Sequence, residues 1–213
     1  MKKYELTAEF IEKWGKKLFR IKALISFGSV EAGELGGYVE KEDNLAQDGN
    51  AWVCGNAWVC GNAWVCGNAR VCGNARVYGN ARVYGNARVY GNAEVYGDAW
   101  VCGDAEVCGD AWVCGNARVY GNARVYGNAD YLLIGRIGSR FSFTTFFKNK
   151  DKGITVSCGC FLGTIAEFRA KVTDTHGNNK HAKMYNLAAD MAELQILGEE
   201  YFDKLNTNKS EPF

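Results

Sequence analysis

Four cysteine and histidine side chains near the end of the chain have the chemistry of a metal site. Cys158 and Cys160 stand two residues apart in a segment that predicts a strand, so we expect both on one strand face. His176 and His181 follow, five residues apart across an expected turn. Thiolates and imidazoles are the ligands that tetrahedral zinc prefers, but this spacing matches no common zinc pattern. We therefore predict that the chain binds no metal and no other cofactor. A zinc site formed by these four residues is the alternative.

Arginine, tryptophan and tyrosine recur in the middle of the chain in a pattern typical of macromolecular recognition. Segment 75–90 reads ARVYGNARVYGNARVY, and it interleaves basic and aromatic residues as many nucleic-acid-binding segments do. The same residue types dominate the energetic centres of protein–protein interfaces. The composition alone allows either a nucleic acid or a protein as partner.

The charge balance makes the nucleic acid the less expected partner. The chain has 25 Lys and Arg against 24 Asp and Glu, a net charge of +1. Within residues 49–132 the charges cancel. Proteins that grip phosphate backbones carry a basic excess, because neutralising phosphates supplies most of their affinity. We therefore expect a protein partner.

The apolar segments and the cysteines predict a cytoplasmic protein. No stretch reaches the roughly 18 apolar residues that a membrane span needs, and the first residues lack the apolar core of a secretory signal. The nine cysteines are odd in number, and most of those in the repeats are neighbours six residues apart. Because that spacing sends neighbouring cysteines to different faces, we expect reduced thiols. Because no apolar stretch is long enough, we expect no contact with a membrane.

A six-residue repeat dominates the sequence. Residues 49–126 are thirteen uninterrupted copies of Gly-[Asn/Asp]-Ala-x-Val-[Cys/Tyr], and its phase continues weakly to residue 144. Ala and Val stand two apart and so point to the same side of an extended chain, whereas x points away. Gly-Asn supplies a sharp corner, since both residues tolerate left-handed backbone. Three copies then close one coil, and residues eighteen apart stack on each other.

This pattern resembles the hexapeptide-repeat family, in which an aliphatic residue is followed four positions later by a small inward residue. Val53 and Ala57 stand in those places, and the match runs through Val125 and Ala129. The resemblance implies a left-handed parallel β-helix of about five coils; a right-handed solenoid is the alternative. Some members are acyltransferases with a histidine base between subunits. The repeats contain no histidine, so we predict no catalytic residue and keep an acyltransferase as the competing function.

Stacking distributes the outward x residues over three columns. The columns read Trp52, Arg70, Arg88, Glu106, Arg124; then Trp58, Arg76, Glu94, Trp112, Asp130; then Trp64, Arg82, Trp100, Arg118, Arg136. The third column alternates tryptophan with arginine, which suits cation–π stacking between neighbouring strands. A self-stabilising ladder is the favoured interpretation of this column, and a recognition face for a protein or nucleic acid is the alternative. The predicted partner-binding residues are Trp64, Arg82, Trp100 and Arg118, with Tyr84 and Tyr120 beside them.

The two ends of the chain predict separate elements. Residues 1–48 form an N-terminal capping segment, with a short helix expected over Thr7–Trp14, and this segment covers the ring of Trp52, Trp58 and Trp64. Residues 49–144 form the β-helix. Residues 145–213 form a strand–helix–helix module, with a strand over Ile154–Cys160, a capping box at Thr164 and Glu167, and a second helix over about 180–197.

These features predict a mainly β, non-enzymatic scaffold that presents an aromatic and charged surface to a protein. The segments 35–40, 157–164 and 175–177 resemble the ends of uncharacterised bacterial and prophage hexapeptide-repeat proteins. That resemblance implies a bacterial or phage source and no established activity. If the source is a phage or prophage, we expect a role directed at a host protein, such as blocking a defence protein. The C-terminal module is expected to be a second contact surface or an element that makes homo-oligomers.

Overall fold

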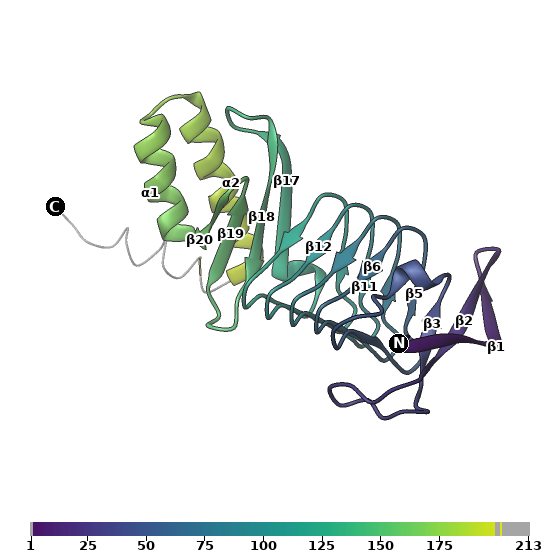
Figure 1. Ribbon diagram of the computed structural model, residues 1–213. Helices are drawn as coiled ribbons and strands as arrows, with labels where there is room; N and C mark the ends of the chain where they lie inside the picture. The colour runs from purple at the N-terminus through teal and green to yellow at the C-terminus, as the bar shows by residue number, and fades with distance from the viewer. Residues whose placement is uncertain (1, 199–200, 202–213) are drawn as a thin grey trace. The chain divides into compact units, whose positions relative to one another are not determined.

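A stack of short parallel strands forms the body of the first of two compact units. The computed structural model describes residues 2–198 and 201, and the chain divides into Met1–Asn128 and Ala129–Phe213. Coil after coil follows the N-terminal strands in the first unit (Figure 1). Its thirteen repeat strands are β4 (Trp52–Val53), β5 (Trp58–Val59), β6 (Trp64–Val65), β7 (Arg70–Val71), β8 (Arg76–Val77), β9 (Arg82–Val83), β10 (Arg88–Val89), β11 (Glu94–Val95), β12 (Trp100–Val101), β13 (Glu106–Val107), β14 (Trp112–Val113), β15 (Arg118–Val119) and β16 (Arg124–Val125).

Each repeat strand from β4 to β13 pairs with the strand eighteen residues further along the chain, which confirms the predicted solenoid. Arg88, for example, lies beside Arg70 in the coil before and Glu106 in the coil after. Hydrogen bonds from one coil to the next hold this register: the Asn50 amide donates to the Gly67 carbonyl oxygen at 2.7 Å. Three parallel ladders result, β4-β7-β10-β13-β16, β5-β8-β11-β14 and β6-β9-β12-β15.

The interior of the coils is built from one small and one branched residue per hexad. Every alanine and valine of the repeat from Ala51 to Val125 is at most 1 % exposed. Each buried valine side chain contributes about 1.5–3 kcal/mol of apolar transfer free energy. The six-residue pattern thus predicted both which side chains turn inward and that they form one continuous column.

The corners require glycine for two reasons. Gly85 has φ +72°, in the left-handed region that side chains with a Cβ avoid. A Cβ at this position would also lie 2.9 Å from the Gly103 backbone nitrogen of the next coil. Corner glycines therefore set the turn and allow the close approach of stacked coils together.

The asparagines that follow these glycines form ladders along the three edges. The Asn50 side-chain amide donates to Asn68 Oδ1 at 2.9 Å, and Asn68 donates to Asn86 at 3.0 Å. Where aspartate replaces asparagine it accepts the last of these bonds, as Asp104 does from Asn86 at 2.9 Å. The aspartates at 98, 104 and 110 are therefore corner residues, as expected.

An antiparallel hairpin replaces the helix expected over Thr7–Trp14. Strands β1 (Tyr4–Lys13) and β2 (Lys16–Ala23) pair around a two-residue turn, Trp14-Gly15, in which both φ angles are positive (51° and 73°). Two positive φ angles are the geometry of the hairpin turn that matches strand twist. The helix prediction was wrong because this turn went unrecognised.

The hairpin continues directly into the solenoid. Strand β3 (Leu35–Val39) pairs with β2 antiparallel and with β5 parallel, so the hairpin extends one solenoid sheet. After a short 3₁₀ helix, η1 (Glu42–Asn44), Leu45 forms a bridge to Val65. The N-terminal segment thus pairs with the backbone of β5 and β6, two of the three strands of the first coil, as a solenoid cap is expected to do.

This cap covers two of the three tryptophans of the first coil. Trp52 is fully buried, with the Phe27 ring 5.4 Å away, and Trp58 lies 4.8 Å from the Trp14 ring. Trp64 remains 42 % exposed. The predicted covering of the tryptophan ring is therefore confirmed for Trp52 and Trp58 and wrong for Trp64.

The second unit combines an antiparallel sheet with two helices. Its strands are β17 (Tyr131–Ile137), β18 (Ser142–Lys148), β19 (Ile154–Cys158) and β20 (Phe161–Thr164), and its helices are α1 (Ile165–His176) and α2 (Lys180–Leu197). The capping box at the start of α1 is confirmed, since Thr164 and Glu167 exchange the two expected hydrogen bonds. Neither described helix combines the length and apolar character that crossing a bilayer requires.

The expected continuation of the β-helix over residues 129–144 is not present. The parallel ladders end at β16; a 3₁₀ helix, η2 (Asn128–Asp130), follows, and β17 then pairs with β18 in antiparallel fashion. The physical reason lies at the next corner, where Leu133 and Ile134 replace the Gly-Asn pair. Neither residue supports the left-handed turn that a corner needs. The boundary between the units therefore falls at Asn128 and not at residue 144.

Deletions that respect or violate the coil length test this architecture. Removing residues 73–90 takes out one complete coil, so the later side chains stay on their faces and we expect one cooperative unfolding transition. Removing residues 73–75 instead deletes one Gly-Asn corner with its alanine, so the coil has fifteen residues and later corners no longer stack on earlier ones, as Gly85 does on Gly67. We expect this shorter deletion to unfold at lower temperature in far-ultraviolet circular dichroism, although it removes less chain. The reverse ranking would contradict the eighteen-residue coil.

Candidate partner-binding face

The third column of outward residues forms a continuous ladder on one face of the solenoid. Trp64 lies beside Arg82, Arg82 beside Trp100 and Trp100 beside Arg118 on four successive strands. We call this surface, together with Tyr84 and Tyr120, the Trp/Arg face. Arg136, which was predicted to extend the column, lies instead in β17 of the second unit.

Trp100 lies between two guanidinium groups at the centre of the Trp/Arg face. The guanidinium carbon of Arg118 is 3.6 Å from the centre of the Trp100 ring, and that of Arg82 is 5.1 Å away. Both distances fall within the reach of a cation–π interaction, which contributes about 0.5–2 kcal/mol. The Tyr84 ring meets the Trp100 ring edge-on at 6.3 Å. These contacts hold four extended side chains in fixed positions at the surface.

The tyrosine hydroxyls of this face stay protonated at neutral pH. Burial and a hydrogen bond with Cys102 raise the pKa of Tyr84 far above its usual value. Burial likewise raises the pKa of Tyr120, whose hydroxyl is hydrogen-bonded with Arg118. Burial also raises the pKa of the Cys102 thiol. The Trp/Arg face therefore presents neutral hydroxyl and thiol groups and positive guanidinium groups.

The other two faces differ because glutamates stand among their arginines. On the second face Glu94 pairs with Arg76 at 2.8 Å and accepts a hydrogen bond from the Tyr78 hydroxyl. On the first face Glu106 lies 3.4 Å from Arg124 and 4.0 Å from Arg88. The column of the Trp/Arg face contains no acidic residue. The acidic residue that shares the groove with its arginines is the corner residue Asp98.

A shallow groove of about 460 Å³ runs beside this column, and it includes residues that sequence reasoning missed. Corner residues form its second wall, so that the groove is lined by Asn62, Asn80, Arg82, Asp98, Trp100, Asn116 and Arg118. The Asn/Asp corner stands two positions before x in every hexad, which places both on the same side of the strand. That spacing is the signal that could have found these corner residues. They add amide donors and acceptors to the aromatic and cationic side chains.

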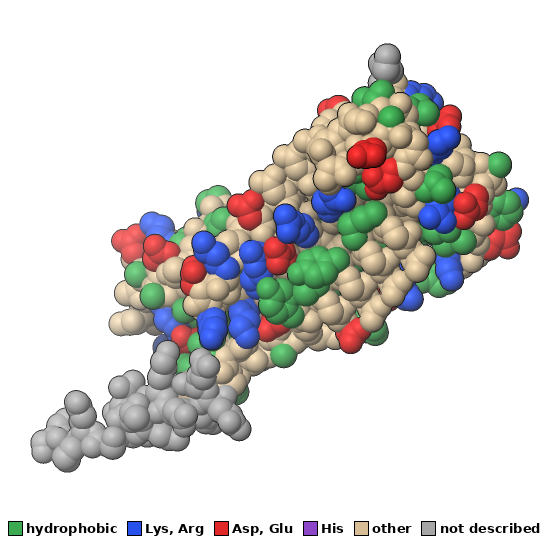
Figure 2. All heavy atoms as spheres, turned by 90° about the horizontal axis from the view of Figure 1, so that it is seen from below, with side chains coloured by type: hydrophobic (Ala, Val, Ile, Leu, Met, Phe, Trp, Pro, Cys, Tyr) green, Lys and Arg blue, Asp and Glu red, His purple; other side chains and the backbone are tan. Residues whose placement is uncertain are grey.

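Aromatic and basic side chains gather along the coils in space-filling view. On the side seen in Figure 2, hydrophobic groups lie next to Lys and Arg groups over the repeats, and Asp and Glu groups lie among them. Such clusters of tryptophan, tyrosine and arginine are typical of the centres of protein–protein interfaces. The arrangement can bind acidic and aromatic groups without first reorganising its own side chains.

The four candidate metal ligands do not assemble. Strand β19 ends at Cys158, and Cys160 lies in the turn that leads to β20, so the prediction that both share a strand face was wrong. The His176 and His181 ring centres are 5.9 Å apart. Across the described residues, no three His, Cys, Asp or Glu side chains form a group that could hold a metal ion.

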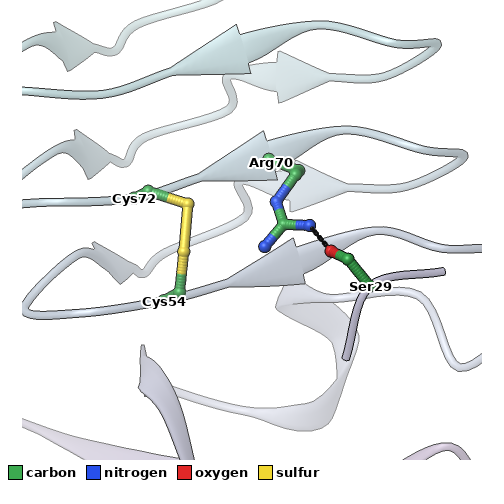
Figure 3. Close-up of a disulfide and its surroundings, with 4 residues drawn as sticks. All are labelled: Ser29, Cys54, Arg70 and Cys72. Carbon is green, nitrogen blue, oxygen red and sulfur yellow. Dashed lines mark hydrogen bonds between the residues drawn. A yellow bond between two sulfur atoms is a disulfide. The ribbon is translucent and has the colours of Figure 1, made fainter. Parts of the chain in front are cut away.

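One pair of cysteines forms a disulfide, against the expectation of reduced thiols. Cys54 and Cys72 stand eighteen residues apart, so they occupy the same place on adjacent coils with 4.6 Å between their Cα atoms. The bond links β4 and β7 next to Arg70, which hydrogen-bonds the Ser29 hydroxyl of the cap (Figure 3). The expectation failed because it compared cysteines six residues apart. Disulfides are favoured in oxidising compartments, so a cytoplasmic location stays a prediction.

Comparison with known families agrees with this fold. The repeats match the family model of the YdcK beta solenoid repeat. The matched segments are residues 69–85, 75–89, 81–97, 87–103 and 117–129. They cover less than half of the chain and include Arg82, Trp100, Arg118 and both tyrosines of the Trp/Arg face. No curated protein matches the chain. The chain is therefore similar to a repeat β-helix family, and the match assigns no activity to it.

Substitution of Trp100 tests whether the ladder stabilises the coil. We expect Trp100→Ala to lower the free energy of unfolding by about 1–3 kcal/mol, because two cation–π contacts and one aromatic contact disappear. Trp112, which is 51 % exposed at the same hexad position, is the control, and Trp112→Ala should cost less than about 0.5 kcal/mol. Equal losses in urea denaturation would show that the Trp100 contacts contribute nothing specific.

Proposed function

We propose that the chain is a non-enzymatic β-solenoid scaffold whose Trp/Arg face binds a protein. The observation that carries this proposal is the fixed stack of Arg82, Trp100 and Arg118 with Tyr84 and Tyr120 beside it. Its side chains are ordered before a partner arrives, so binding loses little side-chain entropy. Backbone hydrogen bonds between coils hold the strands beneath it, which keeps the spacing of the groups constant.

The chemistry of the face defines the partner that fits it. Two guanidinium groups whose column lacks a carboxylate favour acidic side chains, since arginine pairs with carboxylates through two parallel hydrogen bonds. The exposed ring of Trp64 and the edges of the tyrosines favour apolar and aromatic contacts. We therefore propose a protein with an acidic surface that also carries aromatic residues. A phage or prophage origin and a host defence protein as target belong to this proposal, and they are supported by the resemblance of the chain ends alone.

A matched pair of double variants tests the face. Arg82→Gln with Arg118→Gln removes both cations of the Trp/Arg face, whereas Arg88→Gln with Arg124→Gln removes two cations with the same separation from the first face. Immobilised proteins are exposed to nuclease-treated bacterial lysate, and bound proteins are quantified by mass spectrometry. We expect at least one protein that the wild type and the first-face variant retain and that the Arg82/Arg118 variant loses by at least tenfold.

Three results would contradict the proposal. Equal recovery by both variants would show that the Trp/Arg face does not bind the captured proteins. Retention that occurs only when the nuclease is omitted, and that falls steeply with salt, would favour the nucleic-acid alternative. Stabilisation by acyl-coenzyme A that is lost on substitution of His176 or His181 would favour the acyltransferase.

We also propose that the C-terminal unit makes homo-oligomers, and helix α2 supports this. Four large apolar side chains, Met184, Leu187, Met191 and Leu194, are each at least 39 % exposed on this helix. Their spacing of three, four and three residues is that of a coiled-coil seam. An identical helix presents the same seam, so a second copy fits it under two-fold symmetry.

The charges of α2 favour an antiparallel second copy. Lys180 and Lys183 stand in the first half of the helix, and Asp190 and Glu193 in the second half. Arg169 of α1 binds both carboxylates at 2.7 Å and offsets one of the two negative charges. Antiparallel pairing would bring the lysines of each copy near the remaining negative charge of the other.

Substitution in the seam tests this assembly by molar mass. We expect the wild type to be a dimer by light scattering at micromolar concentration, and Leu187→Ser with Met191→Ser to be a monomer. Leu162→Ser on β20 is the control, because Leu162 is equally exposed but lies outside the seam (51 %). A monomeric wild type, or a seam variant that remains dimeric, would refute the role of α2.

A further inference from the structure

The second unit contains a cavity that neither the repeat nor the proposed face explains. It has a volume of about 410 Å³ and opens between the turn after β17, the turn between β19 and β20, and helix α1. Its floor is aromatic: the Phe168 ring lies 5.6 Å from Phe161 and 5.7 Å from Tyr185. A volume in this range suits a small organic molecule.

Two glycines shape the cavity wall. Gly138 has φ +70°, and a Cβ there would overlap the Tyr185 hydroxyl, which occupies that space. Gly159 has φ +61° in the turn opposite, and the Arg140 guanidinium lies over it, 3.4 Å from where a Cβ would be. Both glycines therefore hold Tyr185 and Arg140 at the cavity rather than filling it with side chains of their own.

The charged groups of the cavity are all cationic. Arg140 and Lys171 line it, and the lining contains no Asp or Glu. Lys171 is already paired with Asp174 at 2.9 Å. Arg140, by contrast, forms no ion pair with any acidic side chain in the described part of the chain. The Arg140 guanidinium group beside the apolar cavity can therefore bind the anionic group of a ligand.

The neighbouring hydroxyl does not supply that anion. Burial raises the pKa of Tyr185 to about 12, so its hydroxyl is neutral at physiological pH. It is hydrogen-bonded with Cys158, whose sulfur also lies 3.1 Å from Thr144 Oγ1. His176 stacks on the Tyr185 ring at 5.7 Å. These contacts fix the wall of the cavity, and Arg140 is the charged lining residue without an ion pair among the described residues.

We propose that this cavity binds a small organic carboxylate with an aromatic or aliphatic body. The carboxylate lies against Arg140, whose planar fork matches its two oxygens. The apolar body packs on Phe161 and Phe168, which removes its surface from contact with water. An apolar amide of the same shape buries the same area without the charge-assisted bonds, so the acid binds more tightly.

The matched probes 2-naphthoate and 2-naphthamide test this proposal on the full chain. Titrations followed by calorimetry and by saturation-transfer nuclear magnetic resonance should give an affinity about tenfold higher for the acid, the effect of one charge-assisted pair. Arg140→Gln should reduce the affinity for the acid to that for the amide. Retained binding of the amide would show that the variant cavity is still folded.

Arg136→Gln is the matched control, because Arg136 is exposed nearby in β17 but does not line the cavity. Its affinities for both probes should equal those of the wild type. Phe161→Ala should weaken both probes by the same factor. The proposal is overturned if neither probe binds, if acid and amide bind equally to the wild type, or if Arg136→Gln lowers acid binding as much as Arg140→Gln does.

Discussion

The hydrogen bond from each coil to the next is the interaction on which the first unit depends. Corner alanines such as Ala57 donate within their own coil, to Cys54, but the amides of the corner asparagines and of the strands donate to carbonyl oxygens in the following coil, as those of Asn50 and Trp52 do. This pairing fixes the stacking period at eighteen residues per coil. With this period, each valine packs against a valine of the next coil, and each outward residue lies beside the residue eighteen positions away.

The same constraint converts a linear pattern into a surface. Along the sequence the arginines of segment 75–90 look like one basic stretch, but stacking places Arg76, Arg82 and Arg88 on three different sheets. What gathers on one face is instead the alternation of tryptophan and arginine over four coils. Because the strands below are held on both sides, the alternation becomes a rigid array rather than a flexible basic segment.

The repeat could be predicted from sequence because each hexad contains all the residues that determine its own conformation. Glycine forms the corner, alanine and valine point inward, and the constant six-residue spacing makes three hexads close one coil. The capping box at Thr164 is local in the same sense. Among the predictions that failed, one failed because a turn was not recognised and one because the hexad pattern was extended to residues that cannot form its corner. The hairpin over residues 4–23 depended on one unrecognised turn, and the hexad phase beyond Asn128 lacked a glycine at its next corner. The groove beside Trp100 and the cavity beside Arg140 require side-chain positions that no spacing rule provides.

The native cysteines offer the most direct measurement of the coil length. Trypsin cuts after Lys41, Arg70 and Arg76, so Cys54, Cys60 and Cys66 fall in one peptide and Cys72 in the next. After mild oxidation of the folded chain, fragmentation of the linked peptides in the mass spectrometer should find Cys54 joined to Cys72, because only residues eighteen apart share a face on adjacent coils. A dominant bond from Cys54 to Cys60 or Cys66 would place residues six or twelve apart together. That result would contradict the stack and every face assigned from it.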